Sequence, residues 1–285
     1  MRTEKEMFDL ILGVARQDER IKAVLMMGSR ANEECPKDRY QDYDILYLVE
    51  DVAPFYNNIA WIEEKFGKPA VMQLPELNEN PLLPPDNDGH FTYLCLFEDG
   101  NRIDLSVEDK PYIDDGEPAV ILLDKAGILP DIKVNPDYFH ITRPTAGIYR
   151  DACNEFWWCL NNVAKGIARD ELPYVMEMYN HCVRDMLNQM VEWYIGIHND
   201  FQVSAGKMGK YFKKYLPEGL YEMYAKTYSD SDYCHIWQAV FTACELFRVL
   251  ALEVADFFGY TYNEKEDKNM TRYMEQVRSW ERQEA

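Results

Sequence analysis

The sequence Met26-Met27-Gly28-Ser29-Arg30 leads, with twelve residues between Ser29 and Asp42, into Asp42-Tyr43-Asp44-Ile45. The Gly-Ser pair closes one apolar run and the two aspartates open another, and each run is typical of a buried strand. Because side chains at positions i and i+2 of a strand point to the same face, the two carboxylates converge. Neighbouring carboxylates repel each other unless a cation lies between them, and hard oxygen ligands favour Mg²⁺. This stretch therefore predicts a metal-binding strand end beside a small turn.

The small turn is suited to phosphate binding. Gly28 lets the backbone approach a ligand closely, and the N–H groups and hydroxyl of the Gly-Ser pair can then reach phosphate oxygens. We assign Gly28, Ser29 and Arg30 to nucleotide phosphates. An arginine after a strand is also often only solvated, so this alternative stays open for Arg30.

A third carboxylate is predicted at Asp104. In the run 102–107, alternation places Arg102, Asp104 and Ser106 on one face and apolar residues on the other. Asp42, Asp44 and Asp104 are thus the candidate catalytic residues and metal ligands of a nucleotidyl-transfer site. The alternatives are two solvated acids at a strand end and an ion pair between Asp104 and Arg102.

The pattern of apolar residues predicts an α+β chain. An N-terminal domain, residues 1–135, should contain a mixed β-sheet with flanking helices, and a C-terminal helical bundle domain should cover residues 136–285. A hairpin should place Leu94 and Leu96 opposite Ile103 and Leu105 over a short turn. The expected strands are 22–27, 43–49, 69–73, 91–97, 102–107 and 119–123, and the expected helices are 4–17, 53–66, 146–169, 174–198, 218–228, 233–258 and 269–282.

The Gly-Ser and Asp-x-Asp motifs resemble those of the polymerase-β-like nucleotidyltransferase superfamily. Together with the segments 41–44, 103–105, 153–157 and 204–207, they make nearly the whole chain similar to the aminoglycoside 6-adenylyltransferase family, the streptomycin-modifying group. The resemblance implies ATP as co-substrate, two Mg²⁺ ions, and transfer of AMP to a hydroxyl of a cationic aminoglycoside such as streptomycin, namely its 6-hydroxyl. It also implies that Lys207 and Lys210 contact the nucleotide, although both could simply be solvated at a basic helix start.

An acceptor site is predicted early in the first helix of the bundle. Asn154 and Trp158 are four residues apart, hence on one helix face, and Glu155 lies beside them. An acid with an aromatic ring suits a guanidinium-bearing sugar, through charge-assisted hydrogen bonds and cation–π contact. The alternative is that Trp157 and Trp158 both belong to the core.

Composition narrows the class of partner. The formal net charge of the 285 residues is −20, with no Lys/Arg stripe, which argues against nucleic acid and favours a cationic small molecule. No apolar run approaches the ~20 residues that span a bilayer, and seven irregularly spaced cysteines fit a reducing compartment, so we expect a cytoplasmic protein without a membrane partner. The sequence leaves the oligomeric state open, with a monomer favoured.

Two other functions stay open at this point. One is a nucleotidyltransferase that acts on another small-molecule or protein hydroxyl. The other is a nucleotide-binding interaction protein without turnover, which the three acids Asp42, Asp44 and Asp104 disfavour because such a protein has no need of three like charges together.

Overall fold

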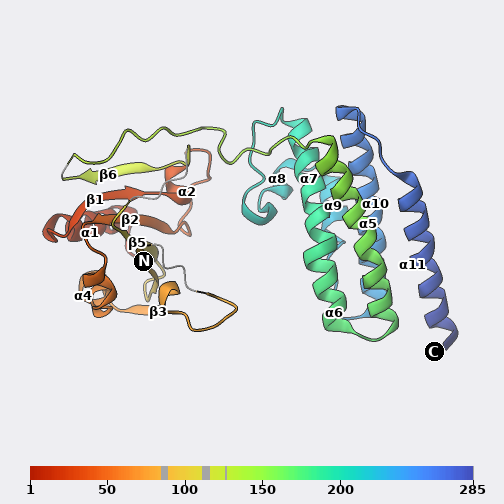
Figure 1. Ribbon diagram of the computed structural model, residues 1–285, viewed down its shortest axis with the longest axis horizontal. Helices are drawn as coiled ribbons and strands as arrows, with labels where there is room; N and C mark the ends of the chain where they lie inside the picture. The colour runs from red at the N-terminus through yellow and green to blue at the C-terminus, as the bar shows by residue number, and fades with distance from the viewer. Residues whose placement is uncertain (85–88, 111–115, 126, 285) are drawn as a thin grey trace. The chain divides into compact units, whose positions relative to one another are not determined.

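The computed structural model describes residues 1–84, 89–110, 116–125 and 127–284 (Figure 1). The chain divides into two compact units, Met1–Tyr138 and Phe139–Ala285. The first unit contains the sheet and the second is helical, so the predicted α+β class is confirmed. None of the described helices is long and apolar enough to cross a membrane.

The first unit is built on one mixed sheet. Among the described residues this sheet has six strands in the order β3-β4-β5-β2-β1-β6. The central strands β2 and β5 pair in parallel, and the other neighbours pair antiparallel. The strands are β1 (Ile21–Met26), β2 (Tyr43–Val49), β3 (Pro69–Gln73), β4 (His90–Phe97), β5 (Arg102–Glu108) and β6 (Val120–Asp124). Each lies within one residue of the range predicted from alternation.

Helices cover one face of this sheet. The helix α1 (Glu4–Gln17) begins at a capping box between Thr3 and Glu6 and buries one apolar stripe against the strands. The other helical segments of the unit are α2 (Gly28–Ala31), α3 (Ala53–Tyr56), α4 (Ala60–Phe66) and the 3₁₀ turn η1 (Pro75–Leu77). On the opposite face a smaller cluster covers β1 and β2, where Leu25 and Leu46 pack near Leu129 and Ile132.

The single helix predicted over 53–66 is wrong, because the chain breaks it into α3 and α4. Trp61 is six positions after Phe55, which at ~100° per residue would place the two rings on different sides of one helix. The break at Asn57 and Asn58 lets both rings enter the same core. Their centroids are 4.9 Å apart in an edge-to-face contact.

The predicted hairpin forms, but its register differs from the prediction. Leu94 pairs with Asp104 and Leu96 pairs with Arg102. Phe91, Tyr93, Cys95 and Phe97 instead fill the core on the helix-covered face. The two leucines therefore share a face with Asp104.

The second unit is a bundle, and the part of it that the structure describes contains no strand. The predicted helical bundle is therefore confirmed, with the last helix starting five residues earlier than expected. A π-helical turn, η2, joins α6 to α7 into one continuous rod. The elements are α5 (Ala146–Ala168), α6 (Leu172–Glu177), η2 (Met178–Val183), α7 (Arg184–His198), η3 (Lys207–Gly209), α8 (Phe212–Tyr215), α9 (Glu218–Ala225), α10 (Tyr233–Phe258) and α11 (Glu264–Glu284).

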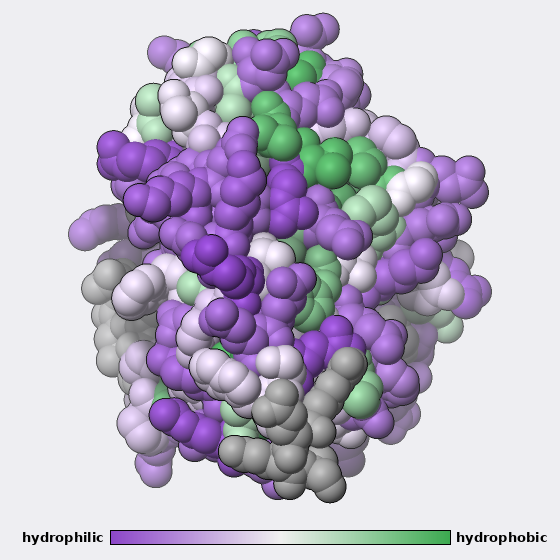
Figure 2. Space-filling model, turned by 90° about the vertical axis from the view of Figure 1, so that its right-hand side faces the viewer, coloured by the Kyte–Doolittle hydropathy of each residue, from purple (hydrophilic) through white to green (hydrophobic). Residues whose placement is uncertain are grey.

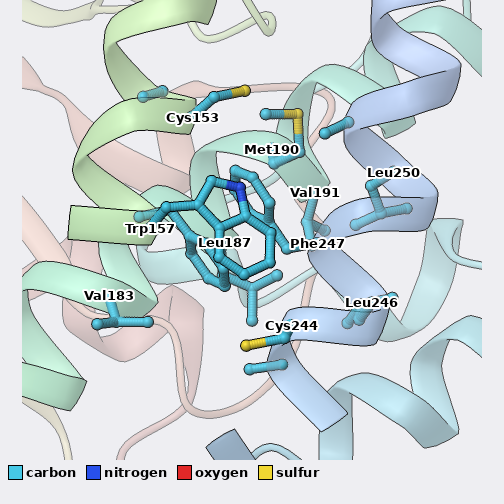
Figure 3. Close-up of a cluster of buried hydrophobic side chains, with 14 of the residues drawn as sticks. Cys153, Trp157, Val183, Leu187, Met190, Val191, Cys244, Leu246, Phe247 and Leu250 are labelled. Carbon is cyan, nitrogen blue, oxygen red and sulfur yellow. The ribbon is translucent and has the colours of Figure 1, made fainter. Parts of the chain in front are cut away.

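Aromatic residues hold the bundle together. Figure 3 shows Trp157 of α5 packed among Leu187 and Met190 of α7 and Phe247 of α10. Phe156 stacks on Phe247 with ring centroids 3.8 Å apart. The face drawn in Figure 2 is mainly hydrophilic with smaller hydrophobic patches, as expected when most apolar side chains are used inside.

An ion pair between a half-buried arginine and a buried aspartate ties α11 to α10. The Nε and Nη2 atoms of Arg248 donate to the two carboxylate oxygens of Asp267, each at 2.6 Å. Tyr262 and Thr271 donate to the same carboxylate at 3.0 and 3.2 Å. Burial by itself raises the pKa of Asp267, but these hydrogen bonds outweigh it and hold the pKa below its usual range.

We expect Arg248→Met to lower the free energy of unfolding by about 3 kcal/mol, because it leaves the Asp267 carboxylate buried without its cation. Lys268→Ala, which removes an exposed pair with Glu264, should change urea denaturation very little. Because the folded pKa of Asp267 is depressed, the contribution of the pair is present above the unfolded pKa and is lost as the pH falls through the folded one. Equal losses in the two variants would contradict this role.

Candidate active site

The parallel pairing of β2 with β5 brings the predicted carboxylates together. Asp44 lies directly beside Asp104 in the register of the two strands. Asp42 precedes β2 by one residue, two positions before Asp44. All three side chains are therefore at one end of the central strand pair.

Arg102 supplies the counter-charge to this cluster. Its Nε and Nη2 atoms donate to the two oxygens of Asp104 at 2.8 and 2.6 Å, and its Nη1 atom lies 3.4 Å from Oδ2 of Asp42. The ion pair between Asp104 and Arg102, weighed above as an alternative to a metal-binding role, is thus present. With this ion pair formed, Asp104 still lies directly beside Asp44 in the register of the two strands.

One guanidinium does not neutralise the cluster. Burial and, after it, the charges of Asp104 and Asp42 together raise the pKa of Asp44 to about 6, against the opposing effect of Arg102. The pKa of Asp42 is also raised, chiefly by burial and additionally by Asp104. A site with this excess of negative charge favours an added cation.

The three aspartates have the chemistry of a divalent-metal site, but their side chains are not arranged around a common point. Within the described ranges, no group of three or more Asp, Glu, His or Cys side chains is placed so as to hold a metal ion. The oxygens of Asp42, Asp44 and Asp104 are the hard ligands that Mg²⁺ prefers, and Arg102 now occupies the place of a cation between two of them. Their role as metal ligands stays a prediction.

Gly28 is fixed against Asp44. Its φ is +65°, and a Cβ there would collide with Oδ2 of Asp44 and lie 2.6 Å from Cγ. The neighbouring Met27 N–H donates to the carbonyl of Asp44 at 2.9 Å. The predicted turn is thus the start of the short helix α2, held beside the carboxylates.

We expect Gly28→Ala to lower kcat at least tenfold, because the added methyl must displace the Asp44 carboxylate and the backbone is strained at positive φ. Gly67→Ala, which also has positive φ but open space around it, provides the control, since strain acts there without a collision. Steady-state rates and thermal unfolding of both variants measure the difference. Equal rates in the two variants would show that the close packing of Gly28 against Asp44 is not needed for activity.

Ser29 is oriented by a neighbour that the sequence analysis did not single out. Nε2 of Gln41 donates to the carbonyl of Ser29 at 3.2 Å and to its Oγ at 3.3 Å. The sequence feature that could have pointed to Gln41 is its position immediately before Asp42. Gln41 thereby connects the phosphate turn to the carboxylate segment.

Arg30 is used differently from the prediction. Its Nε and Nη2 donate to the carbonyls of Asp42 and Gln41, both at 2.9 Å, and Nη1 donates to Glu4 at 2.9 Å. The guanidinium also lies 3.9 Å from the ring centroid of Tyr43. The structure therefore gives Arg30 the task of fixing the backbone before β2. A phosphate contact would require these bonds to break, and it stays a prediction.

The predicted acceptor residues lie together on α5 of the second unit. Asn154, Glu155 and Trp158 are all exposed on one side of the helix, whereas Trp157 is buried in the core. Trp158 is 63% exposed, so the core alternative holds only for Trp157. Glu155 accepts a hydrogen bond from the thiol of Cys159 at 3.1 Å, which leaves its second oxygen available.

The predicted nucleotide lysines lie in a tight segment around η3. Lys207 and Lys210 are both exposed. Gly206 and Gly209 have φ values of +71° and +74°, and a Cβ on either would collide with the ring of Tyr211 or Phe212. This compact turn presents both ammonium groups to solvent, which is compatible with anion binding.

A mixed sheet that gathers three carboxylates beside a Gly-Ser turn has the arrangement of a nucleotidyltransferase. The model of the family described as streptomycin adenylyltransferase matches residues 1–277. The aminoglycoside 6-adenylyltransferase of Bacillus subtilis (strain 168) is 39% identical over 284 residues, covering 97% of this chain and 98% of the relative. That of Campylobacter jejuni is 38% identical over 268 residues, covering 92% and 91%.

A crystal structure of an aminoglycoside 6-adenyltransferase from Bacillus subtilis is 36% identical, covers 97% of this chain and 99% of that one, and superposes with a TM-score of 0.48. On the family match and the two sequence relatives, the chain belongs to the streptomycin adenylyltransferase family, and it is an enzyme of the nucleotidyltransferase class.

Proposed function

We propose that this protein transfers AMP from ATP to a hydroxyl of a streptomycin-like aminoglycoside and releases pyrophosphate. The observation that carries the proposal is the register of Asp44 beside Asp104 on parallel strands, with Gly28 packed against the Asp44 carboxylate. Transfer to the 6-hydroxyl is supported by the names of the relatives, both aminoglycoside 6-adenylyltransferases.

The reaction exchanges one bond to the α-phosphorus for another. The acceptor oxygen bonds to the α-phosphorus, the bond to the bridging oxygen of pyrophosphate breaks, and the hydroxyl proton passes to Asp104. The Ser29 hydroxyl and the backbone N–H groups of the turn hold the phosphates. Two Mg²⁺ ions, held by Asp42, Asp44 and Asp104, would neutralise the charge on the attacking and leaving oxygens when bound.

The second unit contributes the remaining contacts in this proposal. Asn154, Glu155 and Trp158 bind the cationic acceptor, and Lys207 and Lys210 bind the nucleotide. The exposure of all five side chains supports this assignment, as does the net charge of −20, which favours a polycationic ligand.

Pyrophosphate release tests the proposal directly. ATP and GTP are each supplied with Mg²⁺ and with streptomycin, spectinomycin, kanamycin or a lincosamide. We expect turnover with ATP and streptomycin above the other combinations. Turnover with only one of the other acceptors would mean that this acceptor, and not streptomycin, is the substrate. Binding of ATP–Mg²⁺ with no pyrophosphate release in any combination would support the alternative of an interaction protein without turnover.

We expect Glu155→Gln to raise the KM for streptomycin by about tenfold or more, since a charge-assisted hydrogen bond is worth about 1.5–3 kcal/mol. The KM for ATP should be unchanged. Glu222→Gln, an exposed glutamate on α9, serves as the matched charge control. A selective loss of ATP affinity in Glu155→Gln would place the acceptor site elsewhere.

A further inference from the structure

The sheet face that carries the carboxylates continues beyond Asp104 toward an edge. β4 lies beside β5, and β3 lies beside β4 at the end of the sheet. The register places Leu94 beside Asp104 and Gln73 beside Leu94. Asp44, Asp104, Leu94 and Gln73 therefore form one row across four strands.

The neighbouring rows give this part of the face an apolar floor. Leu96 pairs with Arg102 on one side and with Val71 on the other. Leu96 is 41% exposed and Val71 is 64% exposed, although both are on strands of the sheet. On the other side of the row, the hydroxyls of Thr92 and Ser106 lie 3.4 Å apart. We call Val71, Gln73, Leu94 and Leu96 the β3–β4 platform.

The direction from which the acceptor oxygen must attack the α-phosphorus indicates which of the two substrates lies over this platform. Gly28 holds the phosphate turn at the end of β1, on the side of β2 that is away from β5. In a phosphoryl-type displacement the attacking and leaving oxygens are roughly in line. If pyrophosphate leaves toward β1, the acceptor must approach from the side of β5, β4 and β3.

The dimensions of the platform agree with a small acceptor. With strands roughly 4.8 Å apart, Gln73 lies about 10 Å from Asp104, enough for a sugar ring with its substituents. The C–H faces of such a ring pack on apolar side chains, and an amide can bond its hydroxyls.

We infer that the β3–β4 platform is the acceptor-binding floor of the first unit: Leu94, Leu96 and Val71 contact the ring of the acceptor, and the Gln73 amide hydrogen-bonds to its polar groups. This inference rests on the proposed function, because it takes a hydroxylated ring as the acceptor. It adds acceptor-specificity residues from the sheet to those proposed on α5.

Leu96→Ser tests the platform, and Ile121→Ser is its matched control. Ile121 is 40% exposed, lies on the opposite edge strand β6, and shares the carboxylate face through its pairing with Leu25. We expect Leu96→Ser to raise the KM for the acceptor about five- to tenfold, from the loss of about one or two buried CH₂ equivalents. The KM for ATP and the unfolding temperature should stay at the values of the parent enzyme. Ile121→Ser should leave the acceptor KM unchanged.

The outcomes separate this inference from the proposed function. If the parent enzyme turns over and the acceptor KM is the same in Leu96→Ser and Ile121→Ser, the platform is not an acceptor-binding surface. The proposed function then still stands. A higher KM for ATP alone in Leu96→Ser means that the nucleotide lies over β4, which also overturns the inference. A parent enzyme that transfers AMP to no hydroxylated ring removes the proposed function and the platform with it.

Discussion

Asp44→Asn is expected to abolish AMP transfer while the first unit stays folded. The substitution keeps the volume of the side chain and removes the charge that a metal ion needs. Because burial and the charges of Asp104 and Asp42 already raise the pKa of Asp44, neutralising it relieves repulsion rather than breaking a stabilising pair. We expect turnover to fall at least about 100-fold, the effect of losing one preorganised electrostatic contact. Asp42→Asn should act in the same direction.

Two measurements on the same preparation check this result. Pyrophosphate release gives the rate, and thermal unfolding with and without Mg²⁺ gives a readout that does not depend on activity. The parent protein should gain stability from Mg²⁺, and Asp44→Asn should lose that gain. Glu50→Gln, an exposed acid just beyond the other end of β2, controls for the loss of one negative charge. Turnover above a tenth of the parent rate in Asp44→Asn would remove it from the metal site.

The sheet and the carboxylate cluster were predictable from local patterns. In β5 the alternation of Arg102, Asp104 and Ser106 with buried aliphatic residues places the acid on one face without any knowledge of the neighbouring strands. The i, i+2 spacing does the same for Asp42 and Asp44. What joins the two segments is the parallel pairing of β2 with β5, which no local pattern states. The family resemblance implied only that the third carboxylate lies on a neighbouring strand.

The register of β4 was less accessible because apolar residues occur on both of its faces. Hydrophobicity alone does not distinguish Leu94 and Leu96 from Tyr93 and Cys95. The larger aromatic residues of β4 fill the deep core under α3 and α4, where Tyr93 also donates to the carbonyl of Phe55 at 2.8 Å. The leucines are left on the open face, beside the acid.

The role of Arg30 depends on partners that only the folded chain brings near. The carbonyls of Gln41 and Asp42 follow it by eleven and twelve residues through a segment without regular structure. No local pattern predicts that such a segment returns to the guanidinium. From the sequence, phosphate binding is therefore the role expected of an arginine next to such a turn. Its structural role, hydrogen bonding to the backbone before β2, becomes visible only in the folded chain.

Asp104→Asn is expected to separate chemistry from binding. If Asp104 accepts the hydroxyl proton, the chemical step should fall by roughly 10²–10⁴, the contribution of a positioned base. ATP with Mg²⁺ should still bind through Asp42, Asp44 and Ser29. Calorimetric ATP binding beside single-turnover rates measures the two effects separately.

The ion pair with Arg102 makes a companion variant necessary. If Asp104 serves only as the partner of Arg102, then Asp104→Asn and Arg102→Gln should have the same consequence, a small loss of stability with retained turnover. Arg102 is 45% exposed, so the pair itself contributes no more than about 1 kcal/mol. If Asp104 is the proton acceptor, Arg102→Gln should keep most of the single-turnover rate that Asp104→Asn loses. Normal rates in a destabilised Asp104→Asn would exclude this carboxylate from the reaction, because a base that can be removed without slowing the transfer is not the base.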